Sequence, residues 1–255
     1  MADETYAILR EPGATVDVDK VAEVLAPLNG MHIYDVKKTL QHAPGILGLI
    51  GKADAHKALA LLRARGTEAF LVPTSKLITP PSLVELRHGK ITGDGFAFAV
   101  KERHILAPWE QIILIDSARV LMEEQVKVSE VQVPETVGRD GRTSYRVTRK
   151  TRTRSTWREF LDVLCYKPWV HFRIRKESFG FAGTGLPVHP TRDENFLALA
   201  VIFKTRCQNA VEGPGIEPLF DAKPETRRSF SNMKACDNHF LWQVQLRFRK
   251  RKGAG

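Results

Sequence analysis

Long apolar runs, disulfide patterns and signal sequences are missing from this sequence of 255 residues. No stretch of about 18 apolar residues occurs, which argues against a membrane-spanning helix. The three cysteines, Cys165, Cys207 and Cys236, are odd in number and far apart, so they indicate buried thiols in a reducing compartment and not a disulfide framework. Residues 1–4 are acidic at positions 3 and 4 and lack an apolar segment, so we expect no secretory signal and a cytoplasmic protein.

Motifs for catalysis and for metal or cofactor binding are missing as well. No Gly-x-Ser-x-Gly elbow occurs, since residues 183–185 lack the serine, and neither glycine-rich phosphate-binding motif is present. The eight histidines are dispersed; the nearest approach to a ligand pair is Cys236 with His239, whereas a zinc site needs about four ligands. We therefore expect no enzyme, no metal and no cofactor. The alternative is an enzyme with a hidden site, for which a predicted helix–strand junction offers Asp162, Trp169, His171 and Arg173.

The charge of the chain is strongly basic and unevenly distributed. The net charge is +10, and residues 1–75 hold 8 basic and 9 acidic residues, whereas the remainder holds 31 basic and 20 acidic ones. Two clusters dominate the excess: 139–158, with eight basic residues against one acid, and 247–252. We interpret the second cluster as a frayed tail. This asymmetry permits a nucleic acid or an anionic surface as partner without fixing a fold.

Residues 5–73 have the pattern of one small α/β domain. Strands are predicted at 6–9 and 67–72, the second of which stops at Pro73. Between them, apolar residues recur at spacings of three and four, which predicts three helices, at 19–28, 33–41 and 53–65. We expect the glycine-punctuated apolar segment 45–51 to be a loop, either tucked under the helices or exposed as a contact patch.

The order of these pieces resembles the C-terminal domain of the bacterial ribosomal stalk protein. The resemblance rests on Lys20-Val21-Ala22 at the opening of the first helix, on Gly-Met-His-Ile-Tyr-Asp-Val-Lys at 30–37, on Ala43-Pro44, and on 52–66 before the closing strand. It implies a domain that docks partner proteins. The face that the resemblance assigns to docking carries Lys20, Val21, Ile33, Asp35 and Lys37.

Residues 74–82, with Pro80-Pro81, predict a short, stiff linker to a second domain at 83–250, and a chain of this length favours two domains. From residue 83 the apolar period changes to two, which predicts strands. Strands are predicted at 83–88, 96–100, 108–116, 120–133, 144–150, 169–174 and 179–182, and helices at 156–166 and 193–209. This succession predicts an α+β fold, whose second domain is an antiparallel curved sheet or small barrel with packed helices.

The first part of that second domain resembles bacterial pleckstrin-homology-like domains. The resemblance covers residues 82–125, or as far as 209, and rests on a short glycine turn, an apolar strand and then Pro-Trp-Glu-Gln-Ile at 108–112. It implies a binding scaffold with no inherent chemistry. Because such folds serve lipids, peptides and proteins alike, no ligand follows from it.

The sequence thus favours a two-domain adaptor without catalytic activity, which docks a protein partner through its first domain. The alternative is a translation-associated RNA-binding protein that uses the basic segment 139–158, with Tyr145 and Trp157 stacking on bases. On a strand many of the cations would share one face and could contact phosphates. The cations concerned are Arg146, Arg149, Lys150, Arg152 and Arg154. An anionic lipid surface or an acidic protein is a further possible partner of this segment.

Overall fold

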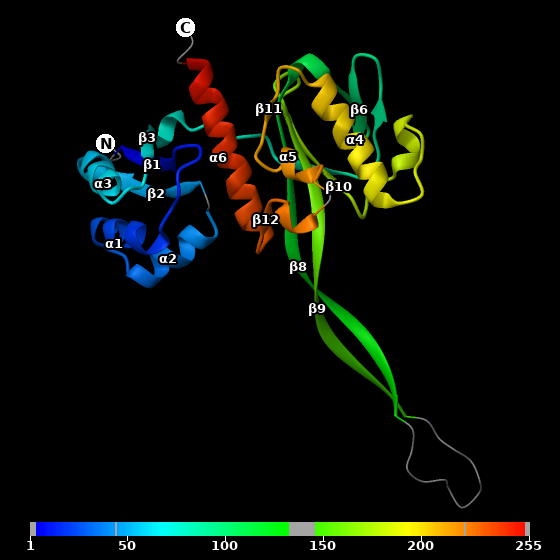
Figure 1. The fold of residues 1–255 in the computed structure, drawn as a ribbon, viewed down its shortest axis with the longest axis horizontal. Coiled ribbons are helices and arrows are strands. Elements are labelled where there is room, and N and C mark those ends of the chain that lie inside the picture. Colours follow the sequence, from blue (N-terminus) through cyan, green and yellow to red (C-terminus); the bar gives the residue numbers. More distant parts are fainter. Residues whose placement is uncertain (1–3, 44, 133–145, 222, 253–255) are drawn as a thin grey trace, which may run out of the picture.

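Figure 1 shows the fold of the protein as a computed structural model, which describes residues 4–43, 45–132, 146–221 and 223–252. Residues 5–73 form an N-terminal unit of three strands and three helices. Its antiparallel sheet has the strand order β2–β1–β3. The elements are β1 (Thr5–Arg10), α1 (Val18–Asn29), α2 (Ile33–Gln41), β2 (Ile46–Gly51), α3 (Lys52–Ala64) and β3 (Ala69–Pro73).

The local sequence explains where the first helix begins and ends. Asp17 accepts hydrogen bonds from two amides of the first turn and so caps α1. Gly30, with a φ of 62°, ends α1 in the left-handed conformation that glycine adopts without strain. The helices bury their apolar residues against Ile8, Leu47 and Ile50 of the sheet. The three predicted helices are confirmed, and each end differs from its prediction by at most one residue.

The segment 45–51 contains a strand and is not the predicted loop. β2 pairs with β1, and apolar residues pack on both of its faces, although Leu49 stays 57% exposed. Leu47 and Ile50 join the core under the helices, whereas Ile46 packs on the opposite side of the sheet. The glycine at the start of this segment serves close packing, since a Cβ atom at Gly45 would lie only 2.1 Å from the Cγ atom of Trp242.

From Leu83 onward the chain forms two further sheets and three helices. The larger sheet has the order β11–β8–β9–β10–β4, with β12 beside β8, and the smaller one has the order β5–β6–β7. In the larger sheet, β8, β9 and β10 are antiparallel to one another in succession, while β4, β11 and β12 each run parallel to the strand they pair with. The elements are β4 (Leu83–Leu86), β5 (Lys90–Ile91), β6 (Gly95–Val100), β7 (Arg103–Pro108), β8 (Ile112–Gln132), β9 (Arg146–Cys165), β10 (Val170–Arg175), α4 (Arg192–Arg206), β11 (Val211–Glu212), α5 (Ile216–Leu219), β12 (Ser229–Phe230) and α6 (Met233–Lys252).

The α+β class is confirmed, and the sheets of the described residues are open, so the alternative of a small barrel is wrong. Strand β9 replaces the helix predicted at 156–166. Leu161 and Val163 face a core that includes α4, whereas Phe160 and Leu164 face α6. A strand that is buried on both faces does not alternate between apolar and polar residues. The apolar residues of 156–166 therefore had a spacing that also fits a helix.

Two smaller predictions also need correction. The strand predicted at 179–182 is instead a turn of 3-10 helix at Phe181–Thr184, where the Thr184 hydroxyl donates to the Phe181 carbonyl at 2.7 Å. Helix α4 begins at Arg192, directly after its Thr191 cap, whereas Asp193 was the predicted first residue. Thr191 and Glu194 form a capping box, which fixes the start of α4 one residue earlier than predicted.

Helix α6 lies between the N-terminal unit and the larger sheet, and both of its sides are buried (Figure 1). On one side Trp242 packs against Leu9 and Phe70 of the N-terminal sheet. On the other side Phe240 and Val244 pack against β8 and β9. Residues 247–252 continue this helix and are not the predicted frayed tail.

The predicted linker also rests on α6. The side chain of Gln245 accepts a hydrogen bond from the Ile78 amide at 2.9 Å and donates to the Ile78 carbonyl at 2.7 Å. Both backbone groups of Ile78 are therefore satisfied by one residue of the helix. As a result α6, which lies far along the sequence, fixes the connection between β3 and β4 as well as the sheet of the N-terminal unit.

Candidate functional site

The predicted docking residues lie on the adjacent helices α1 and α2. Lys37 on α2 forms an ion pair with Asp19 on α1, with 2.7 Å between Nζ and Oδ1, and so links the two helices. Lys20 and Asp35 are exposed and Ile33 is partly buried. Val21 is an exception, because it is fully buried in the core of the unit. Val21 therefore supports the fold and cannot contact a partner.

Two large side chains that the sequence prediction did not single out stand beside these residues. Met31 is 46% exposed and Tyr34 is 66% exposed. Met31 lies in the connection between α1 and α2, and Tyr34 lies in the first turn of α2. The opposite side of the N-terminal unit is covered by α6. The α1–α2 corner, by which we mean Met31, Ile33 and Tyr34 with the charges around them, is thus the outward side of this unit.

The predicted basic segment lies on an arm that projects from the rest of the molecule (Figure 1). The arm consists of the ends of β8 and β9, residues 121–132 and 146–157, which pair from Leu121 with Trp157 out to Gln132 with Arg146. Residues 139 and 142 of the cluster lie outside the described residues. Since directly opposed residues share a face, the register places Arg152, opposite Val126, and Arg154, opposite Glu124, on one face.

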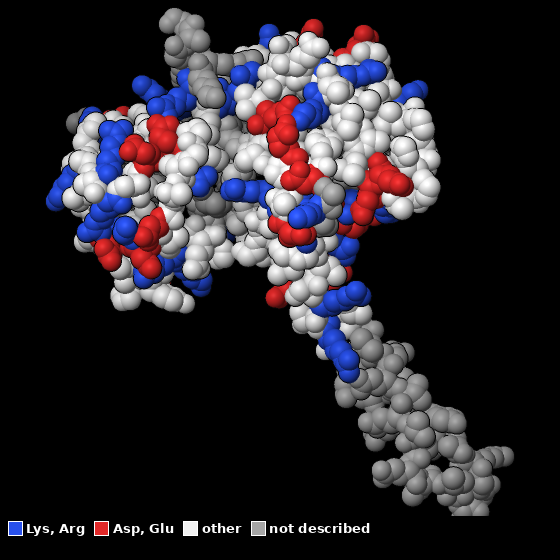
Figure 2. Space-filling view, in the orientation of Figure 1, with Lys and Arg blue, Asp and Glu red and all other residues white. Residues whose placement is uncertain are grey.

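The same register divides the five predicted cations between the two faces. Positions 146 and 150 fall on the face of Arg152 and Arg154, and Arg149 falls on the other. The side chains of Arg146, Arg149 and Lys150 lie outside the described residues, whereas Arg152 and Arg154 are exposed. Figure 2 shows basic side chains on the described part of the arm. By backbone register alone, four of the five positions therefore fall on one face of the arm.

Other charged and aromatic side chains at the base of the arm interact with each other. Arg158 pairs with Glu124, and their ion pair lowers the pKa of Glu124 through the hydrogen bond from Arg158. The guanidinium carbon of Arg119 lies 4.4 Å from the ring centre of Trp157, a cation–π contact. Trp157 is nevertheless 44% exposed, so one part of its indole remains accessible on the face that also includes Arg149.

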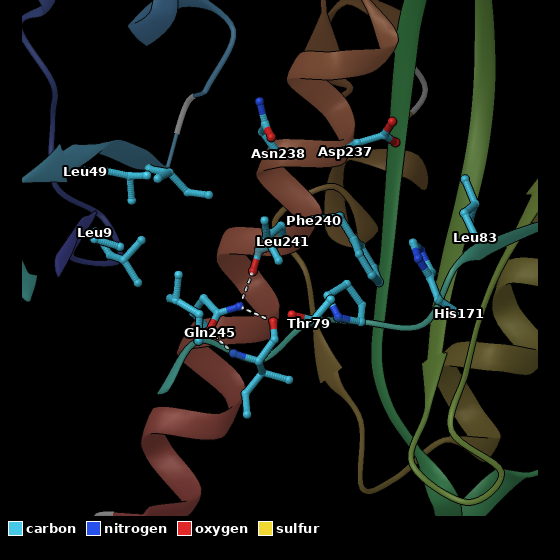
Figure 3. A pocket seen from close by; sticks show the side chains of 15 residues that line it. Leu9, Leu49, Thr79, Leu83, His171, Asp237, Asn238, Phe240, Leu241 and Gln245 are labelled. Carbon is cyan, nitrogen blue, oxygen red and sulfur yellow. Dashed lines mark hydrogen bonds between the residues drawn. The ribbon is translucent and has the colours of Figure 1, made fainter. Parts of the chain in front are cut away.

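A largely apolar pocket of about 560 Å³ lies where the N-terminal unit, the linker and α6 meet. Figure 3 shows Leu9 and Leu49 of the N-terminal unit on one side of it, His171 and Leu83 of the larger sheet on the other, and α6 between them. The His171 ring stacks on Phe240 with 4.2 Å between ring centres. The volume falls within the range of small-molecule sites, but the lining brings few polar groups together.

Next to this pocket lies a buried charge cluster around Arg173. Its Nε atom donates to Asp162 Oδ1 at 2.7 Å, and Nη2 donates to Asp162 Oδ2 at 2.9 Å and to Asp237 Oδ1 at 2.8 Å. Burial alone would favour a neutral Asp162, but the charge of Arg173 outweighs it and lowers the pKa of Asp162 to about 2. The structure thus brings together Asp162, Arg173 and His171 of the predicted junction, while Trp169 stays exposed at 39%.

A second buried acid lies at the centre of the larger sheet. Asp116 accepts from the amides of Ser117 and Gly215, each at 2.9 Å, and from the side chain of Gln243. Burial raises the pKa of Asp116 to about 7. His239 Nε2 lies 3.7 Å from Asp116 Oδ2, and burial lowers the pKa of this histidine to about 3. Neither side chain lines the pocket of Figure 3, and such buried networks also arise for structural reasons alone.

The described residues contain few other groups that could serve in catalysis or metal binding. The three cysteines are free and buried, as predicted, and burial raises the pKa of Cys165 to about 11 and that of Cys207 to about 12, so these thiols stay protonated at neutral pH. Within the described ranges, no group of three or more His, Cys, Asp or Glu residues could hold a metal ion. In the same ranges no helix has the length and apolar character needed to cross a membrane.

No protein-family model, no curated protein and no solved structure matches the chain. The resemblances to a ribosomal stalk domain and to a pleckstrin-like domain therefore stay predictions, and the α1–α2 corner and the arm have to be judged on their own geometry.

Proposed function

We propose that this protein is a non-catalytic adaptor that docks a protein partner through the α1–α2 corner of its N-terminal unit. The observation that carries the proposal is the exposure of Met31 and Tyr34 next to the predicted residues Ile33, Asp35 and Lys37. Stable interfaces place Met and aromatic side chains at the centre and charged ones at the rim, and this corner has that composition.

The way in which the unit is held supports the same proposal. The sheet side is buried against α6 through Trp242, so the unit is attached by one side and presents the helices on the other. Lys20 and Lys37 pair with Asp17 and Asp19 at 3.5 and 2.7 Å. All four side chains are at least one third exposed, so these pairs contribute little to stability and can exchange partners at an interface.

The experiment compares two variants of the full chain for capture of proteins from a nuclease-treated lysate. Met31→Ala combined with Tyr34→Ala is expected to weaken capture of the retained partner at least about tenfold, because a few central side chains carry most of the energy of an interface. The control is Leu61→Ala on α3, which removes another exposed apolar side chain of the same unit. Equal capture by the double variant and the control, with unchanged thermal unfolding, would rule out this corner as the docking face.

A second candidate function, the binding of RNA or DNA by the arm, is favoured by a different observation. From Arg146 to Arg158, β9 holds six basic residues and no acid, and the two-stranded arm projects away from the body (Figure 1). A two-stranded ribbon fits the major groove of duplex DNA, and rows of cations contact phosphates. Arg152 and Arg154 are the described cations that would do so.

Charge reversal at the base of the arm tests this second candidate. Arg152→Glu combined with Arg154→Glu is expected to weaken binding of a labelled 20-nucleotide RNA by at least about tenfold, and to reduce the slope of log affinity against log salt by about 1.4. Fluorescence anisotropy of the full chain at several salt concentrations measures both. Lys101→Glu with Arg103→Glu, at the exposed β6–β7 turn, makes the same change of charge elsewhere. An equal effect of both pairs would show only non-specific attraction.

A further inference from the structure

A second cavity lies between the end of β1, strand β11 and α6, and its charges are unusual. It has a volume of about 490 Å³. Three of its charged lining residues are basic, Arg10, Arg228 and Arg247, and the one acid in the lining is Glu212. That acid already pairs with Lys204 of α4, with 3.3 Å between Oε2 and Nζ. We call this cavity the arginine pocket.

Among the described residues, two of these arginines, Arg10 and Arg228, have no counter-ion. The guanidinium carbon of Arg10 lies 4.6 Å from the ring centre of Trp242, and that of Arg228 lies 5.5 Å from the ring centre of Phe230. The Nε atom of Arg10 is buried and has no hydrogen-bond partner within the described ranges. In the described part of the chain, no carboxylate comes within ion-pair distance of either guanidinium, although both are half-buried.

The two guanidinium charges also act on each other and on the same neighbour. Burial lowers the pKa of Arg10, and the charge of Arg228 lowers it further. His239, which lies between Phe230 and Trp242, has its pKa lowered first by burial and then by the charges of Arg228 and Arg10. Like charges close together in a partly buried site are unfavourable unless an anion joins them.

We propose that the arginine pocket binds the phosphate group of a small organic phosphate. Guanidinium groups match phosphate oxygens with paired hydrogen bonds, and two arginines from distant segments of the chain line this cavity. The remaining wall includes Val211, Trp242 and Leu246, which would contact an apolar part of the ligand. The volume suits a small molecule, and this favours a soluble phosphate ester over a nucleic-acid strand.

The test uses phenyl phosphate, which carries one phosphate and one apolar ring, and inorganic phosphate, both at constant ionic strength. The full chain is expected to bind phenyl phosphate saturably by calorimetry, and about tenfold or more tightly than inorganic phosphate because the ring is buried. Arg10→Met and Arg228→Met should each weaken binding at least tenfold. Arg103→Met, which removes an exposed arginine on β7, should leave it unchanged.

The fold of each variant is checked by thermal unfolding without ligand. Because removal of one guanidinium relieves repulsion, Arg228→Met should unfold no earlier than the unchanged protein. If it fails to fold, Arg228→Lys keeps the charge, loses the paired hydrogen bonds and should still weaken binding several-fold. Absence of saturable binding, or equal binding by Arg10→Met and the unchanged protein, would overturn the proposal. So would binding of a single-stranded RNA at this pocket in place of phenyl phosphate.

Discussion

Asp162→Ala is expected to lower the free energy of unfolding at pH 7 by about 3–5 kcal/mol, because it leaves a buried guanidinium without its main partner. Arg173 is only 2% exposed, and its remaining ion-pair partner, Asp237, is half exposed. Urea unfolding followed by circular dichroism measures the change. A double variant, Asp162→Leu with Arg173→Met, should recover most of the loss, since a buried ion pair can often be replaced by apolar residues of similar size.

The pH dependence of this effect follows from the pKa of Asp162. Its pKa is about 2 in the folded protein against 3.8 as the ordinary value, so the unfolded chain binds more protons between these values. The stabilisation by Asp162 is therefore present above about pH 4 and is lost as the pH falls toward 2. The difference between the unchanged protein and Asp162→Ala should shrink over that window. A loss below about 1 kcal/mol at pH 7, or a double variant no more stable than Asp162→Ala, would contradict the explanation that the buried charge of Arg173, left without its partner, causes the loss.

Trp242→Ala is expected to lower the free energy of unfolding by about 3–5 kcal/mol, which is typical when a large buried aromatic side chain is removed. Trp242 is 4% exposed, packs against Leu9 and Phe70, and donates from Nε1 to the Arg10 carbonyl at 2.8 Å. Its loss opens a space between α6 and the N-terminal sheet. Limited proteolysis should then cut within residues 74–82 well before the rest of the chain.

The matched control is Trp169→Ala, which removes an indole that is 39% exposed. Its ring contacts Tyr166 and Phe248 only at the edge, with ring centres 6.4 and 6.0 Å apart, so a loss of about 1 kcal/mol or less is expected. If Trp242→Ala were no more destabilising than this control, and residues 74–82 stayed protected, α6 would not be what holds the N-terminal unit in place.

The sequence predicts well those elements whose boundaries are set by local chemistry. The cap at Asp17 and the left-handed Gly30 define α1 without reference to the rest of the fold, and the three helices of the N-terminal unit lie where their apolar stripes predict. The three largest failures share one cause, which is burial on two sides. Segment 45–51, the inner part of β9, and α6 each face two different cores, so none of them shows the one-sided pattern on which such predictions depend.

The sequence predicts some residues of the candidate sites but not others. The row of cations on β9 can be read directly from the order of residues, whereas the cluster at Lys20, Asp35 and Lys37 follows only from the resemblance to a ribosomal stalk domain. The contact between Asp162 and Arg173 depends on the register of β9 and β10, in which these two residues are directly opposed. The arginine pocket depends on three elements that are far apart in the chain, so only the tertiary structure brings Arg10 and Arg228 together.

The position of α6 has a consequence for how the molecule is assembled during translation. The sheet that begins the chain emerges early, but the helix that covers its open side is made after every other described element. Until then Leu9 and Phe70 have no cover, and such transiently exposed apolar surfaces invite aggregation. A ribosome that stalls before codon 233 would therefore release a product in need of chaperones, even though its first 73 residues were already complete.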